Sequence, residues 1–141
     1  VIFAGMRRGE DLARHYASAD LFLFASITET FGNVVTEAMA SGLLVIAYDY
    51  AAPGKYIVHG ENGFKAAYDD RDAYLRAIGE AAARREDWPA LREAAVETTR
   101  PLAWDAILTH FESVLMQVIA GEKPDGEPRG ASGGATPPTR E

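Results

Sequence analysis

The chain has 141 residues, which is enough for one domain with its own hydrophobic core. Its net charge of −7 has the wrong sign for non-specific binding to nucleic acid or anionic lipid, and the absence of cysteine excludes disulfides and thiolate metal sites. No apolar stretch approaches the roughly 20 residues of a membrane-spanning helix, and the first residues do not resemble a secretory signal. We therefore expect a cytoplasmic protein with no nucleic-acid partner.

The first half of the chain alternates apolar runs with helix-like segments. In chain order it predicts a buried strand at 1–4, a helix at 10–17, a central strand at 21–25, a helix at 33–41 that ends at Gly42, and a strand at 43–47 that is apolar on both faces.

The second half is mostly helical. It predicts a turn at 51–54, short extended or helical pieces at 56–58 and 64–66 around a turn at 59–63, a helix at 70–85, a short helix from Pro89 and an amphipathic helix at 104–120. Strands that alternate with helices over short connections indicate a parallel sheet with crossover helices. Ligands of such sheets bind beyond the carboxyl ends of the strands, where the loop at 26–32 is expected to lie.

The two ends of the chain suggest how it is divided. Residues 1–120 carry the predicted elements, so we expect one domain there. Residues 121–141 are rich in glycine, proline and charge and predict a disordered tail. The chain starts without methionine, inside a strand-like run, from which we expect it to be the C-terminal piece of a longer protein.

Two glutamates flank the predicted start of the helix at 33–41. Glu29 lies in the preceding loop, and Glu37 lies one turn inside the helix on the same face as Asn33, where its small and apolar neighbours predict partial burial. The unpaired N–H groups at a helix start can hold a diphosphate, and flanking carboxylates can accept hydrogen bonds from sugar hydroxyls. A ligand with phosphate in the middle and polyols on both sides is a nucleotide sugar.

Each of these residues also has a purely structural interpretation. Glu37 can be a solvated or capping glutamate, Glu29 a surface turn residue, Gly32 a simple turn glycine and Asn33 an N-cap. Asp49, at the end of a strand, can face the same cleft or cap a turn. Paired carboxylates also occur in glycoside hydrolases, but a helix start that attracts anions favours a donor that carries phosphate.

Other kinds of site have weaker support in the sequence. The three histidines have no metal-ligand spacing, so we expect them to be structural or exposed. The chain contains neither a Gly-x-Gly-x-x-Gly run after a strand nor a Walker-type lysine. It also lacks a Gly-x-Ser-x-Gly nucleophile elbow.

Five stretches, in order, resemble the retaining glycosyltransferases of family GT4, also called glycosyl transferases group 1. Glu29 and Glu37, with seven residues between them, match the Glu-x7-Glu motif of that family. The other four are residues 1–5 (strand and glycine), 16–26 (with Ala25 in place of the common proline), 37–47 (Glu-Ala-Met-Ala-x-Gly, with Leu44 in place of proline) and the turn 59–63. The resemblance covers about residues 1–120.

The resemblance implies an α/β fold, with a Rossmann-like parallel sheet covered by helices on both faces. It implies the C-terminal, donor-binding half of a GT-B enzyme, in which two such domains enclose a cleft. By this resemblance Glu37 would bind the ribose hydroxyls and Glu29 those of the donor sugar, as the catalytic pair. The implied donor-binding residues are Gly5, Met6 and Arg7 near the base, Thr30, the backbone amides of Phe31, Gly32, Asn33 and Val34 near the sugar and diphosphate, and Glu37.

The resemblance also implies the reaction and its partners. The donor would be a GDP- or UDP-sugar such as GDP-mannose or UDP-glucose, the acceptor a lipid or glycan, and the configuration retained without a metal cofactor. The acceptor domain and the phosphate-binding arginine and lysine of the family would precede Val1, so we expect this chain alone to be inactive. Contact with the inner membrane face would be at most peripheral.

An alternative is a non-catalytic module that binds a nucleotide sugar, or a partner chain through the helix at 104–120. The last helix of the family often crosses to the other domain, so we expect Trp104 and the apolar face around Phe111 to be exposed in this chain and prone to association. A GT-B epimerase is disfavoured by the Glu-x7-Glu match, and a phosphorylase by the lack of a pyridoxal-binding lysine context.

Overall fold

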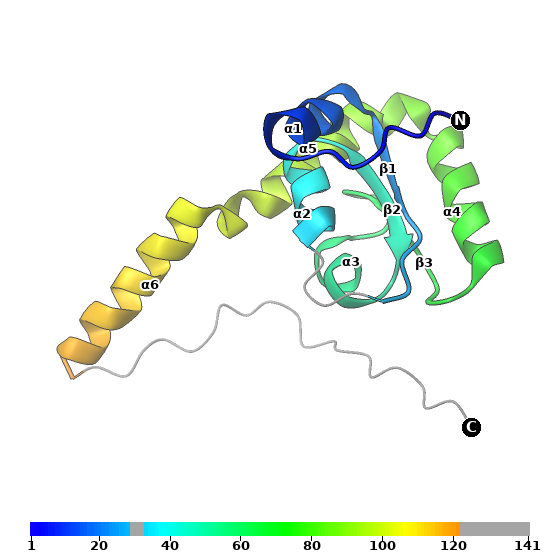
Figure 1. Cartoon of the computed structure of the whole chain (residues 1–141). Helices are drawn as coiled ribbons and strands as arrows, with labels where there is room; N and C mark the ends of the chain where they lie inside the picture. The colour runs from blue at the N-terminus through cyan, green and yellow to red at the C-terminus, as the bar shows by residue number, and fades with distance from the viewer. Residues whose placement is uncertain (29–32, 122–141) are drawn as a thin grey trace.

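A computed structural model describes residues 1–28 and 33–121 (Figure 1). In chain order its elements are α1 (Gly9–Ser18), β1 (Leu21–Phe24), α2 (Asn33–Ala40), β2 (Leu44–Tyr48), α3 (Ala51–Tyr56), β3 (Phe64–Ala66), α4 (Arg71–Ala83), a 3₁₀ turn (Arg85–Asp87), α5 (Trp88–Thr99), a second 3₁₀ turn (Arg100–Leu102) and α6 (Trp104–Ile119). Residues 122–141 of the predicted tail lie outside the described part of the chain.

The three strands form a parallel sheet in the order β1-β2-β3. Leu21 pairs with Leu44, and Ile46 pairs with Phe64. All five residues of β2 are buried, because this strand has a neighbour on each side and helices over both faces. Our prediction that 21–25 is a central strand was wrong, since β1 lies at the edge of the described sheet and β2 is central.

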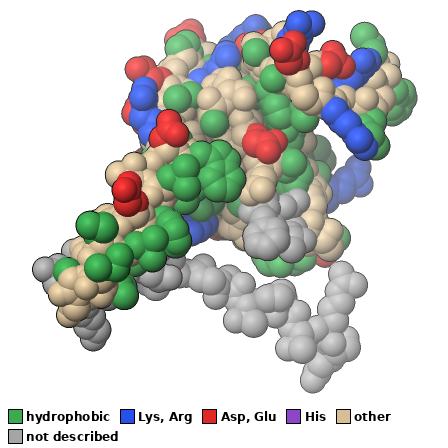
Figure 2. All heavy atoms as spheres, turned by 60° about the vertical axis from the view of Figure 1, so that its left-hand side comes forward, with side chains coloured by type: hydrophobic (Ala, Val, Ile, Leu, Met, Phe, Trp, Pro, Cys, Tyr) green, Lys and Arg blue, Asp and Glu red, His purple; other side chains and the backbone are tan. Residues whose placement is uncertain are grey.

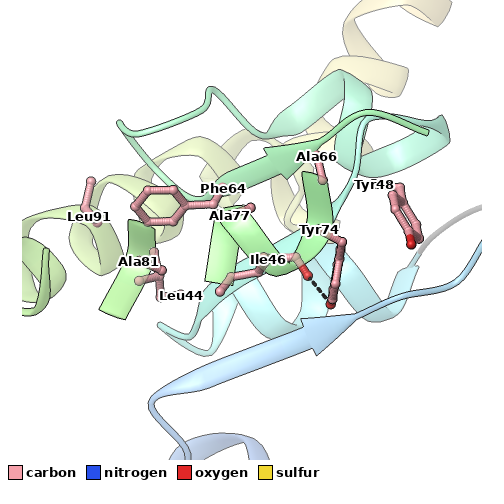
Figure 3. Close-up of a cluster of buried hydrophobic side chains, with 9 residues drawn as sticks. All are labelled: Leu44, Ile46, Tyr48, Phe64, Ala66, Tyr74, Ala77, Ala81 and Leu91. Atoms are coloured by element: carbon pink, nitrogen blue, oxygen red, sulfur yellow. Dashed lines mark hydrogen bonds between the residues drawn. The ribbon is translucent and has the colours of Figure 1, made fainter. Parts of the chain in front are cut away.

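Alternate side chains of β2 enter two separate cores. Leu44, Ile46 and Tyr48 pack with Phe64 against α4, whose Tyr74 hydroxyl donates a hydrogen bond of 3.1 Å to the Ile46 carbonyl (Figure 3). On the other face, the core contains Val45 and Ala47 of β2, Val35, Ala38 and Met39 of α2, and Ala95 of α5. The predicted parallel sheet with helices on both faces is therefore confirmed.

The ends of two helices are fixed by local chemistry. After α2, Gly42 has a φ of +73°, its N–H donates to the Met39 carbonyl at 2.9 Å, and the Leu43 N–H donates to Ala38 at 3.0 Å. This left-handed glycine stops the helix as predicted. Before α4, the Asp70 side chain accepts a hydrogen bond from the Ala73 N–H at 2.8 Å and so caps the helix start.

Two predicted elements differ from the structure. Residues 1–4 form no strand, and the side chains of Val1, Ile2 and Phe3 are at least 93% exposed. An apolar run becomes a buried strand only where another strand supplies hydrogen bonds, and no described strand pairs with this one. Residues 51–54 belong to helix α3 rather than to a turn, and Pro53 fits there because it lies in the first turn, where its N–H has no helical partner.

Helix α6 extends away from the rest of the fold and buries none of its residues (Figure 1). Trp104 is 76% exposed and Phe111 is 59% exposed, and hydrophobic side chains gather along this arm (Figure 2). The helix and its exposed apolar face are as predicted. Among the described residues, no helix has both the length and the apolar character needed to cross a membrane.

Candidate functional site

Glu37 lies on the outer face of α2. The helix buries Val35, Ala38 and Met39 against the sheet, so the helical period turns Glu37 away from the core. Its side chain is exposed, and the prediction of partial burial was wrong because small neighbours on the buried side of a helix do not cover its other side. The carboxylate is thus open to a ligand.

Asn33 is the first residue of α2 and is exposed on the same side as Glu37. The N-cap interpretation of Asn33 stays a prediction, because the residues before it lie outside the described part of the chain. The Asn33 carbonyl accepts a hydrogen bond of 3.0 Å from the Thr36 hydroxyl, which tightens the first turn. Val34 is also at the surface, 36% exposed.

A groove of about 710 Å³ lies beside Glu37. Its floor and walls come from α2, α3, α5 and the start of α6, so segments distant in sequence meet there. Apolar side chains of α6 form one part and polar groups of α2 another. The lining residues are Asn33, Thr36, Glu37, Ala40, Tyr56, Val96, Thr99, Arg100, Leu102, Ala103, Trp104 and Ile107.

The charge of Glu37 also reaches α1. Tyr16 is half-buried, with its ring centroid 5.9 Å from that of Phe22 on β1. Burial raises the pKa of the Tyr16 phenol, and the negative charge of Glu37 raises it further. The carboxylate is therefore electrostatically linked to α1 as well as to the groove.

The predicted base-binding residues Gly5, Met6 and Arg7 precede α1 and are exposed. Gly5 has a φ of +73°, and Arg7 donates a hydrogen bond of 3.0 Å to Asp11 inside α1. None of the three is among the described residues that line the groove. The structure thus brings Asn33 and Glu37 together in one groove but leaves residues 5–7 apart from it.

Four predicted site residues, Glu29, Thr30, Phe31 and Gly32, lie outside the described residues. The roles assigned to them stay predictions. The joint role of Glu29 and Glu37 also stays a prediction, because only Glu37 is among the described residues.

The histidines and Asp49 are occupied by structural contacts or exposed. The Lys65 N–H donates to Nδ1 of His59 at 3.0 Å, while Nε2 of His59 lies 3.1 Å from Glu80. Asp49 forms an ion pair of 3.0 Å with Lys65. Within residues 1–28 and 33–121, no group of three or more histidine, aspartate or glutamate side chains is placed to hold a metal ion.

Sequence reasoning missed a group of tyrosines near the carboxyl ends of the strands. The Tyr68 hydroxyl, after β3, donates a hydrogen bond of 2.8 Å to the carbonyl of Ile27, after β1. The two residues are 41 positions apart, so no local pattern could have indicated the contact.

Comparison with known proteins finds relatives along most of the chain. A model of the family described as glycosyl transferases group 1 matches residues 1–84, a range that includes both glutamates. A GDP-mannose-dependent alpha-mannosyltransferase from Mycolicibacterium smegmatis is 36% identical over 116 residues, which is 81% of this chain and 31% of that protein. A D-inositol 3-phosphate glycosyltransferase from Corynebacterium glutamicum is 31% identical over 125 residues, 89% of this chain and 30% of that protein.

A solved structure has the same fold. The sucrose-phosphate synthase from Thermosynechococcus elongatus superimposes with a TM-score of 0.73 at 29% identity, over 86% of this chain and 31% of that one. The chain thus spans about three tenths of the length of the relatives it matches. Its described sheet and helices correspond to part of a GT-B architecture, and the chain belongs to the glycosyl transferases group 1 family, GT4.

Proposed function

We propose that this chain is the donor-binding part of a retaining glycosyltransferase that moves a sugar from a nucleotide-diphosphate sugar to a lipid or glycan acceptor. The observation that carries the proposal is the position of Glu37. Its exposed carboxylate lies one turn inside the helix that follows β1, beside a groove, in a range that matches the family. Ligands of parallel sheets bind where such helices begin.

The proposed roles follow from what each group can donate or accept. The Glu37 carboxylate accepts hydrogen bonds from the ribose hydroxyls, and Glu29 accepts them from the donor sugar. Backbone N–H groups of residues 31–34, at the start of α2, approach the sugar and diphosphate. Their partial positive charge stabilises the negative charge that develops on the leaving diphosphate. Residues 5–7 lie near the base.

The relatives suggest which donor to test first. The Mycolicibacterium relative is named for GDP-mannose, so GDP-mannose is the first donor, with UDP-glucose as the second. The Corynebacterium relative is named for an inositol phosphate, which supports adding that acceptor to a panel of lipids and glycans. The acceptor domain would be supplied by sequence outside this chain, and the reaction would need no metal.

The test uses the protein expressed from its complete reading frame, with Glu37→Ala as the variant. We expect the KM for the donor to rise and kcat to fall by several orders of magnitude, because the ribose loses its hydrogen-bond acceptor and the donor its orientation. Glu86→Ala is the matched control, since Glu86 is an exposed glutamate in the 3₁₀ turn Arg85–Asp87, beyond the matched range. Near wild-type kinetics of Glu37→Ala would contradict the assignment of Glu37 to donor binding.

Two further measurements test whether the configuration is retained and whether the reaction needs a metal. Proton NMR of the first-formed product is expected to show the anomeric configuration of the donor, and inversion would contradict the retaining mechanism. Activity is expected to survive EDTA, and restoration of a lost activity by a divalent metal would overturn the metal-independent proposal. Concentration-dependent association of the protein with no nucleotide-sugar binding would favour the alternative of a non-catalytic module.

A further inference from the structure

The groove beside Glu37 contains a cation to which the proposed function gives no role. Among the described residues that line it, Glu37 and Arg100 are the only two with charged side chains. Arg100 is the first residue of the 3₁₀ turn between α5 and α6, and this junction lies beside α2 (Figure 1). The groove therefore presents one carboxylate and one guanidinium to the same ligand.

The backbone holds Arg100 in a fixed turn. Its N–H donates to the Glu97 carbonyl at the end of α5, and its own carbonyl accepts a hydrogen bond of 3.2 Å from the Ala103 N–H. Thr99 before it is buried, and Pro101 after it has a φ fixed by its ring. A cation on such a turn can meet a ligand without the cost of first ordering a loop.

The side chain of Arg100 has donors left for a ligand. Its Nε lies 2.6 Å from a carboxylate oxygen of Glu97, and within the described residues this is the only partner of the guanidinium. A guanidinium donates from all of its nitrogens in a planar fork, so Nη1 and Nη2 keep their donors for an anion. The side chain is 69% exposed, so an anion in the groove can reach it.

A nucleotide carries the two chemical groups that these charges select. Its ribose hydroxyls donate hydrogen bonds to a carboxylate, and its phosphate oxygens accept them from a guanidinium. The ribose and the first phosphate are linked through the 5′ position, so both fit within a groove of about 710 Å³. When Glu37 binds the ribose, Arg100 is the only described cation that lines the same groove.

We propose that Arg100 is a phosphate-binding residue, which donates hydrogen bonds to the diphosphate of the nucleotide sugar whose ribose is bound by Glu37. This inference rests on the proposed function. Asn33, the first residue of α2, lines the same groove. Arg100 and the N–H groups at the start of α2 therefore act on the same part of the ligand, the diphosphate.

The test is Arg100→Gln in the protein from its complete reading frame, with GDP and UDP binding measured by isothermal titration calorimetry. We expect the Kd of the nucleotide that binds to rise roughly fivefold to thirtyfold, because a charge-assisted hydrogen bond is lost from a site partly screened by solvent. The Kd of the matching nucleoside, guanosine or uridine, is expected to stay unchanged, because it has no phosphate. Arg100→Lys is expected to recover part of the affinity, since it keeps the charge without the planar fork.

Arg76→Gln is the matched control. Arg76 is 71% exposed, forms an ion pair with Asp70 at the start of α4, and is not among the described residues that line the groove. We expect this variant to bind nucleotide and nucleoside as the wild type does. Both variants are expected to melt within about 3 °C of the wild type, because changes to exposed side chains alter stability little.

Two results would overturn the inference. One is a nucleotide Kd of Arg100→Gln equal to that of the wild type, or a loss of affinity that is equal for nucleotide and nucleoside. The other is a loss confined to an inositol phosphate, which would assign Arg100 to an acceptor instead of the donor.

The failure of this inference and of the proposed function can be told apart. If the wild-type protein binds neither GDP nor UDP, both fail. If it binds nucleotide through Arg100 but transfers no sugar, the proposed function fails and the phosphate contact stands. If the wild type is active, Glu37→Ala is inactive and Arg100→Gln binds nucleotide as Arg76→Gln does, only the role of Arg100 is refuted.

Discussion

Two apolar runs of this chain look alike in sequence and have opposite structures. Residues 44–47 (Leu-Val-Ile-Ala) lie in β2 and are completely buried, whereas residues 1–4 (Val-Ile-Phe-Ala) form no strand and are exposed. The difference is the surroundings. β2 has a strand on each side and a helix layer over each face, and the first run has no partner strand in the described chain.

Helices α2 and α6 show the same contrast between an apolar face that is buried and an apolar face that is exposed. Both are amphipathic, but α2 buries Val35, Ala38 and Met39 against the sheet and α6 buries nothing. Hydrophobic composition therefore measures the capacity of a segment for burial, and a facing surface from elsewhere decides whether the burial occurs.

The largest effect expected from this comparison is on stability. We expect Ile46→Ala to lower the free energy of unfolding by about 3–4 kcal/mol, because it removes a fully buried side chain and leaves a cavity. Ile2→Ala, the same substitution at a site that is 93% exposed, is expected to change it by less than about 0.5 kcal/mol. Urea denaturation of the two variants measures both values. Equal losses would contradict the difference in burial between the two apolar runs.

A second prediction concerns pH and the buried side of the sheet. Burial, with a smaller contribution from Tyr48, raises the pKa of Tyr74 to about 12 from a usual value of 10.0. The unfolded chain ionises this phenol near its usual pKa while the folded chain does not. The stability that Tyr74 contributes is therefore complete below pH 10 and is lost as the pH rises toward 12.

The size of this effect is at most about 3 kcal/mol, because the pKa of this one phenol rises by about two units and each unit corresponds to about 1.4 kcal/mol. Urea denaturation at pH 8 and at pH 11 measures it, with Tyr74→Phe as the comparator because it lacks the ionising group. We expect the wild type to lose more stability between these pH values than the variant does. Equal losses would contradict the assignment to Tyr74.

The smallest expected effect on stability lies in α6. Phe111 is 59% exposed, so Phe111→Glu is expected to change the free energy of unfolding by less than about 0.5 kcal/mol. The same change places a charge on the exposed apolar face and is expected to weaken association of the chain. Analytical ultracentrifugation over a range of concentrations measures this. A large loss of stability would mean that α6 packs against the domain in solution.

In the candidate site, as in the fold, features that are local in sequence were predictable and features that depend on long-range packing were not. The position of Glu37 one turn inside a helix start was predictable, because the helix pattern, Gly42 and the glutamate spacing are all local in sequence. Its exposure was not, since that depends on which face of α2 meets the sheet. The link between Tyr68 and Ile27 was not predictable either, because two strands and their crossovers bring these residues together.

The sequence by itself determined the order of strands and helices after residue 8 except for helix α3, the end of α2 at Gly42, the start of a helix near Asp70, the parallel sheet and the family. These depend on periodicity, caps and motifs, which act within a few residues. The tertiary structure decided which apolar runs are buried, which strand is central, that residues 51–56 form a helix, and which side chains meet at the carboxyl edge of the sheet. Burial and long-range contacts require a facing surface, and that surface comes from segments far along the chain.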